Sequence, residues 1–111
     1  MANSANSLVG NYEHAALEAR IEITEANVAN GQGKGIFHYE SIEVPFALKF
    51  HFENSSGPIT NLTICGSKDD PNQYLGAAGL TTNQGYPTIE VAGGLARTNG
   101  VISMTGVYKR V

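Results

Sequence analysis

Cysteine is nearly absent from this sequence, and tryptophan is absent altogether. The single thiol, Cys65, excludes an intrachain disulfide and any metal motif built on several thiolates. Because Cys65 lies between Ile64 and Gly66 in an apolar stretch, we expect it to be buried and inert. Basic residues are also few, since seven Lys and Arg, scattered along the chain, face ten Asp and Glu. This distribution provides no basic patch for a phosphate backbone, so we expect no nucleic-acid partner.

Long hydrophobic runs are missing too. No apolar stretch approaches the roughly 20 residues that a helical membrane span needs, so we expect no membrane span. Residues 1–7, rich in Asn, Ser and Ala, lack the charged start and apolar run of a secretory signal. We expect this segment to be a flexible tail and the protein to be cytoplasmic. Secretion stays open as an alternative if a leader has been removed.

What remains is a chain of 111 residues with 41% hydrophobic residues. This length suits one compact domain with one core, which we assign to residues 8–111. The thirteen glycines follow no Gly-X-Y period, so a collagen-like structure is excluded.

Two segments alternate between apolar and polar residues, which is typical of half-buried strands. In residues 44–53, four large apolar side chains fall on one face and polar side chains fall mainly on the other. Residues 17–24 behave in the same way. At the helical period, Ile23 would leave the apolar face that Leu17 and Ile21 share, so a strand fits this segment better than a helix.

Turn-forming sequences separate such segments at short intervals. Asn-Gly pairs at 30–31 and 99–100 favour two-residue hairpins, because Asn and Gly tolerate positive φ. We expect the glycine-rich residues 31–35 to form a loop. The predicted strands are 8–14, 17–27, 35–41, 44–54, 59–66, 73–81, 88–96 and 101–111.

Eight short strands at near-even spacing, without a convincing helix, predict an all-β fold. We expect a single eight-stranded antiparallel up-and-down β-barrel, and a two-sheet β-sandwich is the alternative. Closure into a barrel removes the unpaired edges of an open sheet. Gly76, Gly79, Gly93 and Gly94 lie inside predicted strands, where glycine permits a sharp bend or a close approach of another backbone.

The two ends of the chain resemble the calycin group, which comprises avidin-like and lipocalin-like barrels. Gly-Asn-Tyr at 10–12 stands where that group's first strand carries Gly-X-Trp. Residues 106–110 supply the glycine, the aromatic and the basic residues of a last strand. The resemblance implies that a basic residue of the last strand packs on the ring of Tyr12. Avidin-type biotin sites are lined with tryptophans, so the resemblance gives no support for biotin binding.

A second resemblance lies in Tyr-Leu-Gly-Ala-Ala-Gly at residues 74–79. This segment is similar to the glycine-rich central strand of allene oxide cyclase-type and dirigent-type barrels. Those barrels guide the cyclisation or coupling of hydrophobic intermediates without a cofactor. Both resemblances imply an eight-stranded antiparallel barrel with a hydrophobic lumen, and they imply different chemistry.

His38 and Glu40 are the candidate catalytic residues, with Tyr39 between them, because a His and a carboxylate on one face can transfer protons. Two registers are open. If Phe37 and Tyr39 point inward, His38 and Glu40 face solvent, and in the reverse register they line the lumen. Residues 13–14, Glu-His, would also place ionisable groups at the barrel mouth, although on opposite faces of the strand.

Metal ligands are sparse. His38 and His51 fall on neighbouring predicted strands, but His51 shares a face with Lys49 and Glu53 and is expected to be solvated. The acidic pair at 69–70 precedes Pro and Asn, a combination typical of a turn. We therefore expect no metal site and no cofactor.

Tyrosines are the expected ligand contacts, since each offers a large apolar ring and a hydroxyl group. One asparagine and one arginine add polar groups that can orient a ligand. The predicted ligand-binding residues are Asn11, Tyr12, Tyr39, Tyr74, Arg97 and Tyr108.

These features predict a non-catalytic binding protein. It would hold an apolar or partly apolar small molecule, or a sugar, in the lumen or at the mouth of the barrel. The alternative is a cofactor-free cyclase or isomerase that acts on a hydrophobic substrate inside the barrel. A third hypothesis is a structural or interaction role with a filled lumen. The low charge and the Gly/Ala-rich strands also favour a homo-oligomer.

Overall fold

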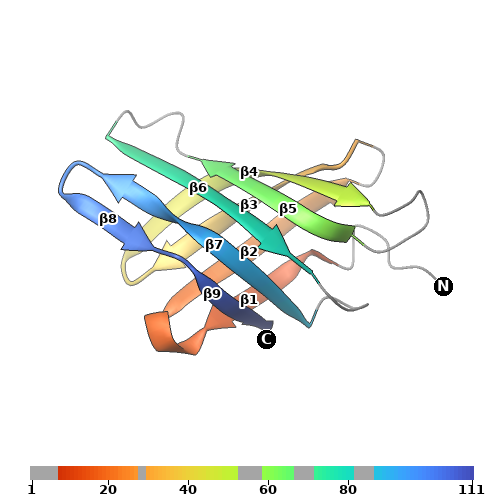
Figure 1. The fold of residues 1–111 in the computed structure, drawn as a ribbon, viewed down its shortest axis with the longest axis horizontal. Helices are drawn as coiled ribbons and strands as arrows, with labels where there is room; N and C mark the ends of the chain where they lie inside the picture. The colour runs from red at the N-terminus through yellow and green to blue at the C-terminus, as the bar shows by residue number, and fades with distance from the viewer. Residues whose placement is uncertain (1–7, 28–29, 53–58, 67–71, 82–86) are drawn as a thin grey trace.

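The computed structural model describes residues 8–27, 30–52, 59–66, 72–81 and 87–111. Within these ranges the chain forms nine strands and a short 3-10 helix (Figure 1). The predicted tail at 1–7 lies outside the described residues. The elements are β1 (Gly10–His14), η2 (Ala15–Leu17), β2 (Ala19–Asn27), β3 (Gln32–Tyr39), β4 (Ile42–Phe52), β5 (Ile59–Gly66), β6 (Gln73–Leu80), β7 (Thr88–Arg97), β8 (Gly100–Ser103) and β9 (Gly106–Arg110).

The sheet closes on itself, and every neighbouring pair of strands is antiparallel (Figure 1). Strands β1 to β6 pair in chain order, β7 pairs with β6, and β9 pairs with both β7 and β1. Strands β8 and β9 pair with successive parts of β7 and so share one place in the ring. Among the described residues the ring therefore has eight members. The predicted up-and-down barrel is confirmed, and the continuous ring replaces the two-sheet alternative.

Alternate residues of each strand point into the barrel, as the sequence pattern predicted. In β2 the inward residues Ala19, Ile21 and Ile23 are at most 3% exposed. Burying each large apolar side chain stabilises the fold by about 1.5–3 kcal/mol. The interior is therefore a packed core. Its largest fully buried side chains are Tyr12, Tyr108, Phe37, Leu8, Ile21, Ile23, Leu48, Leu62, Ile64 and Leu75.

The glycine-rich segment 31–35 is not a loop, and that prediction is wrong. Strand β3 begins at Gln32, and its alternate glycines take inward positions. A Cβ atom at Gly35 would lie 2.4 Å from Cζ of Phe46 and 2.5 Å from the carbonyl oxygen of Glu22. Glycine is needed here because the ring of Phe46 occupies the space beside this backbone.

The sequence predicted a strand over residues 17–27, but β2 begins two residues later, at Ala19. One turn of 3-10 helix, η2, precedes it and is followed by Glu18, whose φ of 51° lies in the left-handed region. This turn connects β1 to β2 at one end of the barrel, and strand alternation starts only at Ala19. No helix among the described residues has the length and apolar character to cross a membrane.

The predicted last strand, 101–111, is interrupted at Met104 and Thr105. The Thr105 hydroxyl donates a hydrogen bond to the Gly93 carbonyl at 3.3 Å and accepts one from the Gly93 N–H at 3.2 Å. Gly93 has a φ of 156°, and a Cβ there would lie 2.3 Å from the Gly76 carbonyl oxygen. The close backbone approach expected of these strand glycines is therefore present at Gly93.

Cys65 is exposed, and the prediction of a buried thiol is wrong. In β5 the inward residues are Leu62 and Ile64, each 2% exposed, so alternation turns Cys65 outward. Its Sγ atom lies 3.5 Å from the hydroxyl oxygen of Tyr74 on the neighbouring strand β6. The apolar neighbours of Cys65 in the sequence are inward residues on the other face of the strand.

We predict that Gly35→Ala lowers the free energy of unfolding by about 1–3 kcal/mol, because the new methyl group overpacks the space beside Phe46. Urea unfolding followed by circular dichroism measures the loss. Gly79→Ala is the matched control, since Gly79 is also buried but its Cβ would meet Ile89 Cγ2 at 3.3 Å, with no closer contact. An equal loss in both variants would contradict the packing account.

Candidate functional site

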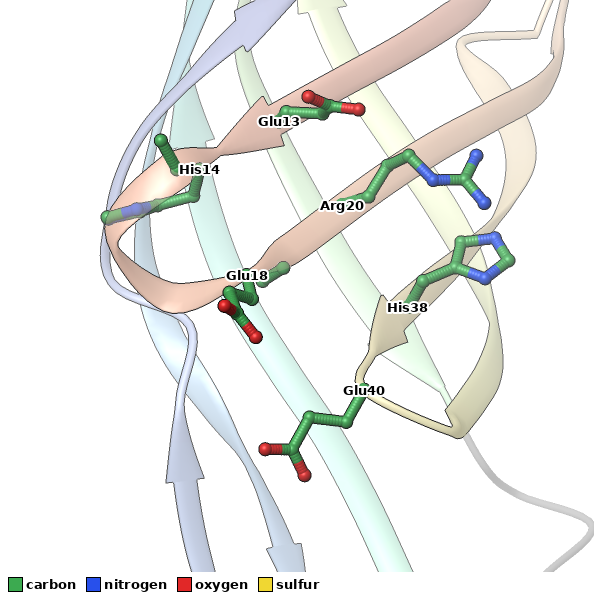
Figure 2. A pocket seen from close by; sticks show the side chains of 8 residues that line it. Glu13, His14, Glu18, Arg20, His38 and Glu40 are labelled. Atoms are coloured by element: carbon green, nitrogen blue, oxygen red, sulfur yellow. The ribbon is translucent and has the colours of Figure 1, made fainter.

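A cavity of ≈ 450 Å³ lies at one end of the barrel, beside η2 and the β3–β4 turn (Figure 2). This volume falls in the range of small-molecule pockets, about 300–1,000 Å³. The cavity lies at the rim, where the outer face of the barrel meets its end. It is lined by Glu13, His14, Ala15, Glu18, Ala19, Arg20, His38 and Glu40.

Three lining residues form one row across the outer face of the barrel. Glu13 on β1 lies opposite Arg20 on β2, and Arg20 lies opposite His38 on β3. Their chain neighbours Tyr12, Ile21 and Phe37 are fully buried, so alternation turns the row outward. Figure 2 shows the three side chains leaving adjacent strands on the same side of the ribbon.

Two neighbours hold the Arg20 guanidinium in place. Its Nη1 donates a hydrogen bond to the Oδ1 atom of Asn11 and lies 3.8 Å from the Oε1 atom of Glu22. A guanidinium has five N–H donors, so these contacts leave donors for a bound molecule. Asn11, one of the predicted ligand contacts, therefore orients a cavity residue from outside the lining.

His38 lies between two carboxylates. Its Nε2 is 3.0 Å from Oε1 of Glu22, and its Nδ1 is 3.2 Å from Oε1 of Glu43. The contact with Glu22 is a hydrogen bond, and the contact with Glu43 is within ion-pair distance. Of the two registers that the sequence left open, the structure has the one in which Phe37 points inward and His38 outward.

Glu18 and Glu40 occupy the two turns that border the cavity. Both have left-handed backbone conformations, with φ of 51° and 53°, which are uncommon for residues other than glycine. Figure 2 shows both side chains at the end of the barrel, apart from the Arg20 and His38 side chains. No side-chain hydrogen bond or ion pair joins the carboxylates of Glu13, Glu18 or Glu40 to another residue that the structure describes.

His14 contributes a ring to the same end of the barrel. Its imidazole lies 5.2 Å from the ring of Tyr108, centre to centre, in an edge-on arrangement. The ring fits because residue 106 is glycine: a Cβ atom at Gly106 would lie 2.1 Å from the His14 Nε2 atom. His14 therefore lines the cavity and also contacts Tyr108, a residue of the packed interior.

Two predicted ligand contacts, Tyr12 and Tyr108, lie in the interior and are 0% exposed. The Tyr12 hydroxyl donates to the Leu8 carbonyl at 2.7 Å and accepts from Nη1 of Arg110 at 2.8 Å. The Tyr108 hydroxyl donates to the Met104 carbonyl at 2.7 Å. Both hydroxyl groups are therefore satisfied by the protein itself.

Arg110 also packs on the ring of Tyr12, with its guanidinium carbon 5.4 Å from the ring centre. Its Nη2 donates a hydrogen bond to the Val9 carbonyl at 2.8 Å. This is the contact between the last and first strands that the calycin resemblance implies. This contact links Val9, near the start of the described residues, to β9, the last strand of the barrel.

The remaining predicted residues are spread over the barrel. Tyr74 is 58% exposed on the outer side of β6, Arg97 is exposed at the end of β7, and Tyr39 is half-buried at the end of β3. Of all predicted site residues, the cavity brings together His38 and Glu40. Their roles as catalytic or ligand-binding residues stay predictions.

Sequence reasoning placed Glu13 and His14 at a barrel mouth but missed Arg20 and Glu18. Arg20 was detectable, because hairpin pairing of the first three strands sets it between Glu13 and His38. Glu18 was not detectable from the sequence, since nothing in the alternation of apolar and polar residues indicates a 3-10 turn at this point. Within the described ranges, no group of three or more His, Cys, Asp or Glu side chains is arranged to hold a metal ion.

Comparison with protein-family models, with curated proteins and with solved structures gives no match. The cavity and its lining side chains are thus the observations on which a function can be based.

Burial raises the pKa of Tyr108 to about 12, from the ordinary value of 10.0. The unfolded chain therefore loses this proton first as the pH rises. We predict that the stability contributed by Tyr108 is complete below about pH 10 and is lost between about pH 10 and pH 12.

Urea unfolding at about pH 8 and about pH 11 measures this loss in the wild type and in Tyr108→Phe, which lacks the hydroxyl. The wild type should lose more stability between the two pH values than the variant, because the other titrating groups are common to both proteins. Equal losses would show that Tyr108 is not the group responsible.

Proposed function

We propose that this protein binds a small polyhydroxy molecule of the sugar class in the cavity at the end of its barrel. The observation that carries the proposal is that donors and acceptors line one volume of ≈ 450 Å³. Arg20 supplies fixed N–H donors, whereas Glu13, Glu18 and Glu40 supply carboxylate acceptors.

The packing of the interior favours this location over the lumen. The inward rings of Tyr12, Phe37 and Tyr108 are each 0% exposed. A barrel of eight strands has room for its own side chains or for one small ligand. Filling by side chains therefore supports a site at the rim, where the predicted residues His38 and Glu40 also lie.

The signs of the lining charges favour a neutral ligand rich in hydroxyl groups. The three carboxylates would repel an anionic ligand, and the Arg20 guanidinium would repel a cationic one. Each hydroxyl group of a neutral ligand, in contrast, can both donate and accept a hydrogen bond. Ala15 and Ala19 add small apolar contacts. A sugar, or another partly apolar polyol, matches this mixture.

We also propose that the barrel belongs to the calycin group. Support comes from the closed antiparallel ring and from the packing of Arg110 on the ring of Tyr12. The hydrogen bond from Arg110 to the Val9 carbonyl adds a second link between the chain ends. The group assignment concerns architecture, and the sugar proposal rests on the cavity alone.

Titration of the ¹⁵N-labelled protein with a panel of neutral and amino sugars tests the function. We expect saturable shifts at Glu13, Arg20, His38 and Glu40. Glu40→Gln should weaken binding about tenfold or more, because a hydrogen bond to a charged group contributes about 1.5–3 kcal/mol. Glu25→Gln, at an exposed carboxylate of β2 outside the lining, is the control and should bind normally. Shifts confined to the barrel interior, or none with any sugar, would refute the proposal.

A second candidate is cofactor-free acid–base chemistry at the same cavity, in a cyclase or isomerase. His38 favours it, because this imidazole lines the cavity and two carboxylates orient it. Since Glu22 and Glu43 occupy both ring nitrogens, one of these contacts must open when His38 transfers a proton to or from a substrate.

For this second candidate we predict that His38→Gln lowers turnover of an apolar polyene or fatty-acid-derived substrate by about 100-fold or more. Product formation followed by chromatography measures the rate. A chelator should have no effect, and Glu25→Gln should keep the wild-type rate. Unchanged turnover in His38→Gln would exclude the histidine as the acid or base.

A further inference from the structure

One carboxylate oxygen contacts two residues of the cavity lining. The Oε1 atom of Glu22 lies 3.0 Å from Nε2 of His38 and 3.8 Å from Nη1 of Arg20. The first distance is that of a hydrogen bond, whereas the second is that of an ion pair without a hydrogen bond. Glu22 itself is not part of the lining. Its carboxylate therefore contacts both cavity residues from outside the cavity and lies nearer to the imidazole.

The register of the strands explains this arrangement. Arg20 is paired with His38 across β2 and β3, whereas Glu22 is paired with Ile36. Because Ile21 between them is buried, Arg20 and Glu22 both point outward. Glu22 lies two residues farther from η2 along β2, and the cavity lies beside η2. A guanidinium that moves towards Glu22 therefore moves away from the cavity.

We propose that Glu22 is a positioning residue that links the protonation of His38 to the position of the Arg20 guanidinium. A protonated imidazole holds the carboxylate by a charge-assisted hydrogen bond. A neutral imidazole attracts the carboxylate less, so Glu22 then forms a full ion pair with Arg20. The N–H donors of Arg20 turn from the cavity towards Glu22 in that state. The proton on His38 thus keeps the guanidinium available to a ligand.

The groups around His38 single out Glu22 as the link. The charged residues that face His38 from β2 and β4, or follow it in the outward row and at the β3–β4 turn, are Glu13, Arg20, Glu22, Glu40 and Glu43. Glu22 and Glu43 lie within ion-pair distance of the imidazole. Within the described ranges, only Glu22 also forms an ion pair with Arg20. A change of charge on His38 therefore reaches Arg20 through this carboxylate.

The link makes binding at the cavity depend on pH, and this step rests on the proposed function. Histidine side chains ordinarily change charge between about pH 5 and pH 8. We expect the affinity for a sugar to fall about fivefold or more over this interval, as the imidazole loses its proton. Because such coupling is reciprocal, a bound sugar should make His38 keep its proton to a higher pH.

Nuclear magnetic resonance of the free protein tests the link without any ligand. In the ¹³C,¹⁵N-labelled wild type, the ring signals of His38 are followed from about pH 5 to about pH 8.5. The Nε and Cζ signals of Arg20 are recorded by carbon detection in the same samples. We expect the Arg20 signals to shift with the same midpoint as the ring of His38.

Three variants separate Glu22 from its neighbours. Glu22→Gln keeps the size of the side chain and removes its charge, so the Arg20 signals should no longer follow the imidazole. Glu43→Gln is the matched comparison, because it removes the other carboxylate beside His38, and it should keep the Arg20 response. Glu25→Gln, at an exposed acid of β2, should also keep the response. If Glu22→Gln does not fold by circular dichroism, Glu22→Thr replaces it, since threonine suits a strand.

Titration with the panel of neutral sugars at about pH 5.5 and about pH 8 tests the consequence for binding. The wild type should bind about fivefold or more tightly at the lower pH, and Glu22→Gln should bind about equally at both. His14 also lines the cavity, but any pH dependence that it contributes persists in Glu22→Gln.

The two arms of the experiment fail separately. Arg20 signals that do not follow His38 in the wild type, or that follow it equally in Glu22→Gln, overturn the link. A sugar that binds the wild type equally at both pH values overturns the pH dependence. If no sugar binds while the Arg20 signals follow His38 in the wild type alone and not in Glu22→Gln, the link is supported and the proposed function fails.

Discussion

The first and last strands of the chain pair with each other, and this contact closes the sheet. Tyr12 of β1 faces Arg110 of β9 across the seam, and the Arg110 side chain donates hydrogen bonds to the Tyr12 hydroxyl and the Val9 carbonyl. Without the seam, β1 and β9 would each present an unpaired edge to solvent. Closure also decides which side of every strand is interior, so it sets both the core and the outward row Glu13, Arg20 and His38.

Most of the fold follows from a period of two residues that is visible in the sequence. Alternation around Ile21 and Phe46 sorts inward from outward residues, because a slip of one residue would expose the whole apolar set. The errors arose where local composition was weighed above that period. The prediction of a buried Cys65 rested on its apolar neighbours, although its place beside the inward Ile64 turns it outward. The prediction of a loop at 31–35 rested on its glycine content, although Gly33 and Gly35 share the inward face.

The site was only partly predictable, because residue type indicates which contacts a side chain can make, whereas its place in the fold decides whether it reaches the cavity. His38 and Glu40 were selected by type, and the structure brings both to one cavity. Tyr12 and Tyr108 were also selected by type, as amphipathic rings that suit a pocket. Their hydroxyls instead bond to carbonyls four residues earlier in the chain. A single sequence does not reveal such a local partner, since it depends on how the backbone bends at the end of the strand.

The outward residues carry the information about function, since the inward ones are explained by packing. An exposed row of charged groups such as Glu13, Arg20 and His38 contributes little to stability, because surface ion pairs are worth about 0–1 kcal/mol. Exposed rings and aliphatic side chains, such as Tyr74 and Val101, gain no hydrophobic stabilisation while they face water. Neither group is required by the barrel. The first group gathers on β1 to β3 and the second on β6 to β8, across the ring from each other. The barrel therefore has two separate outward surfaces whose residues its own packing does not explain.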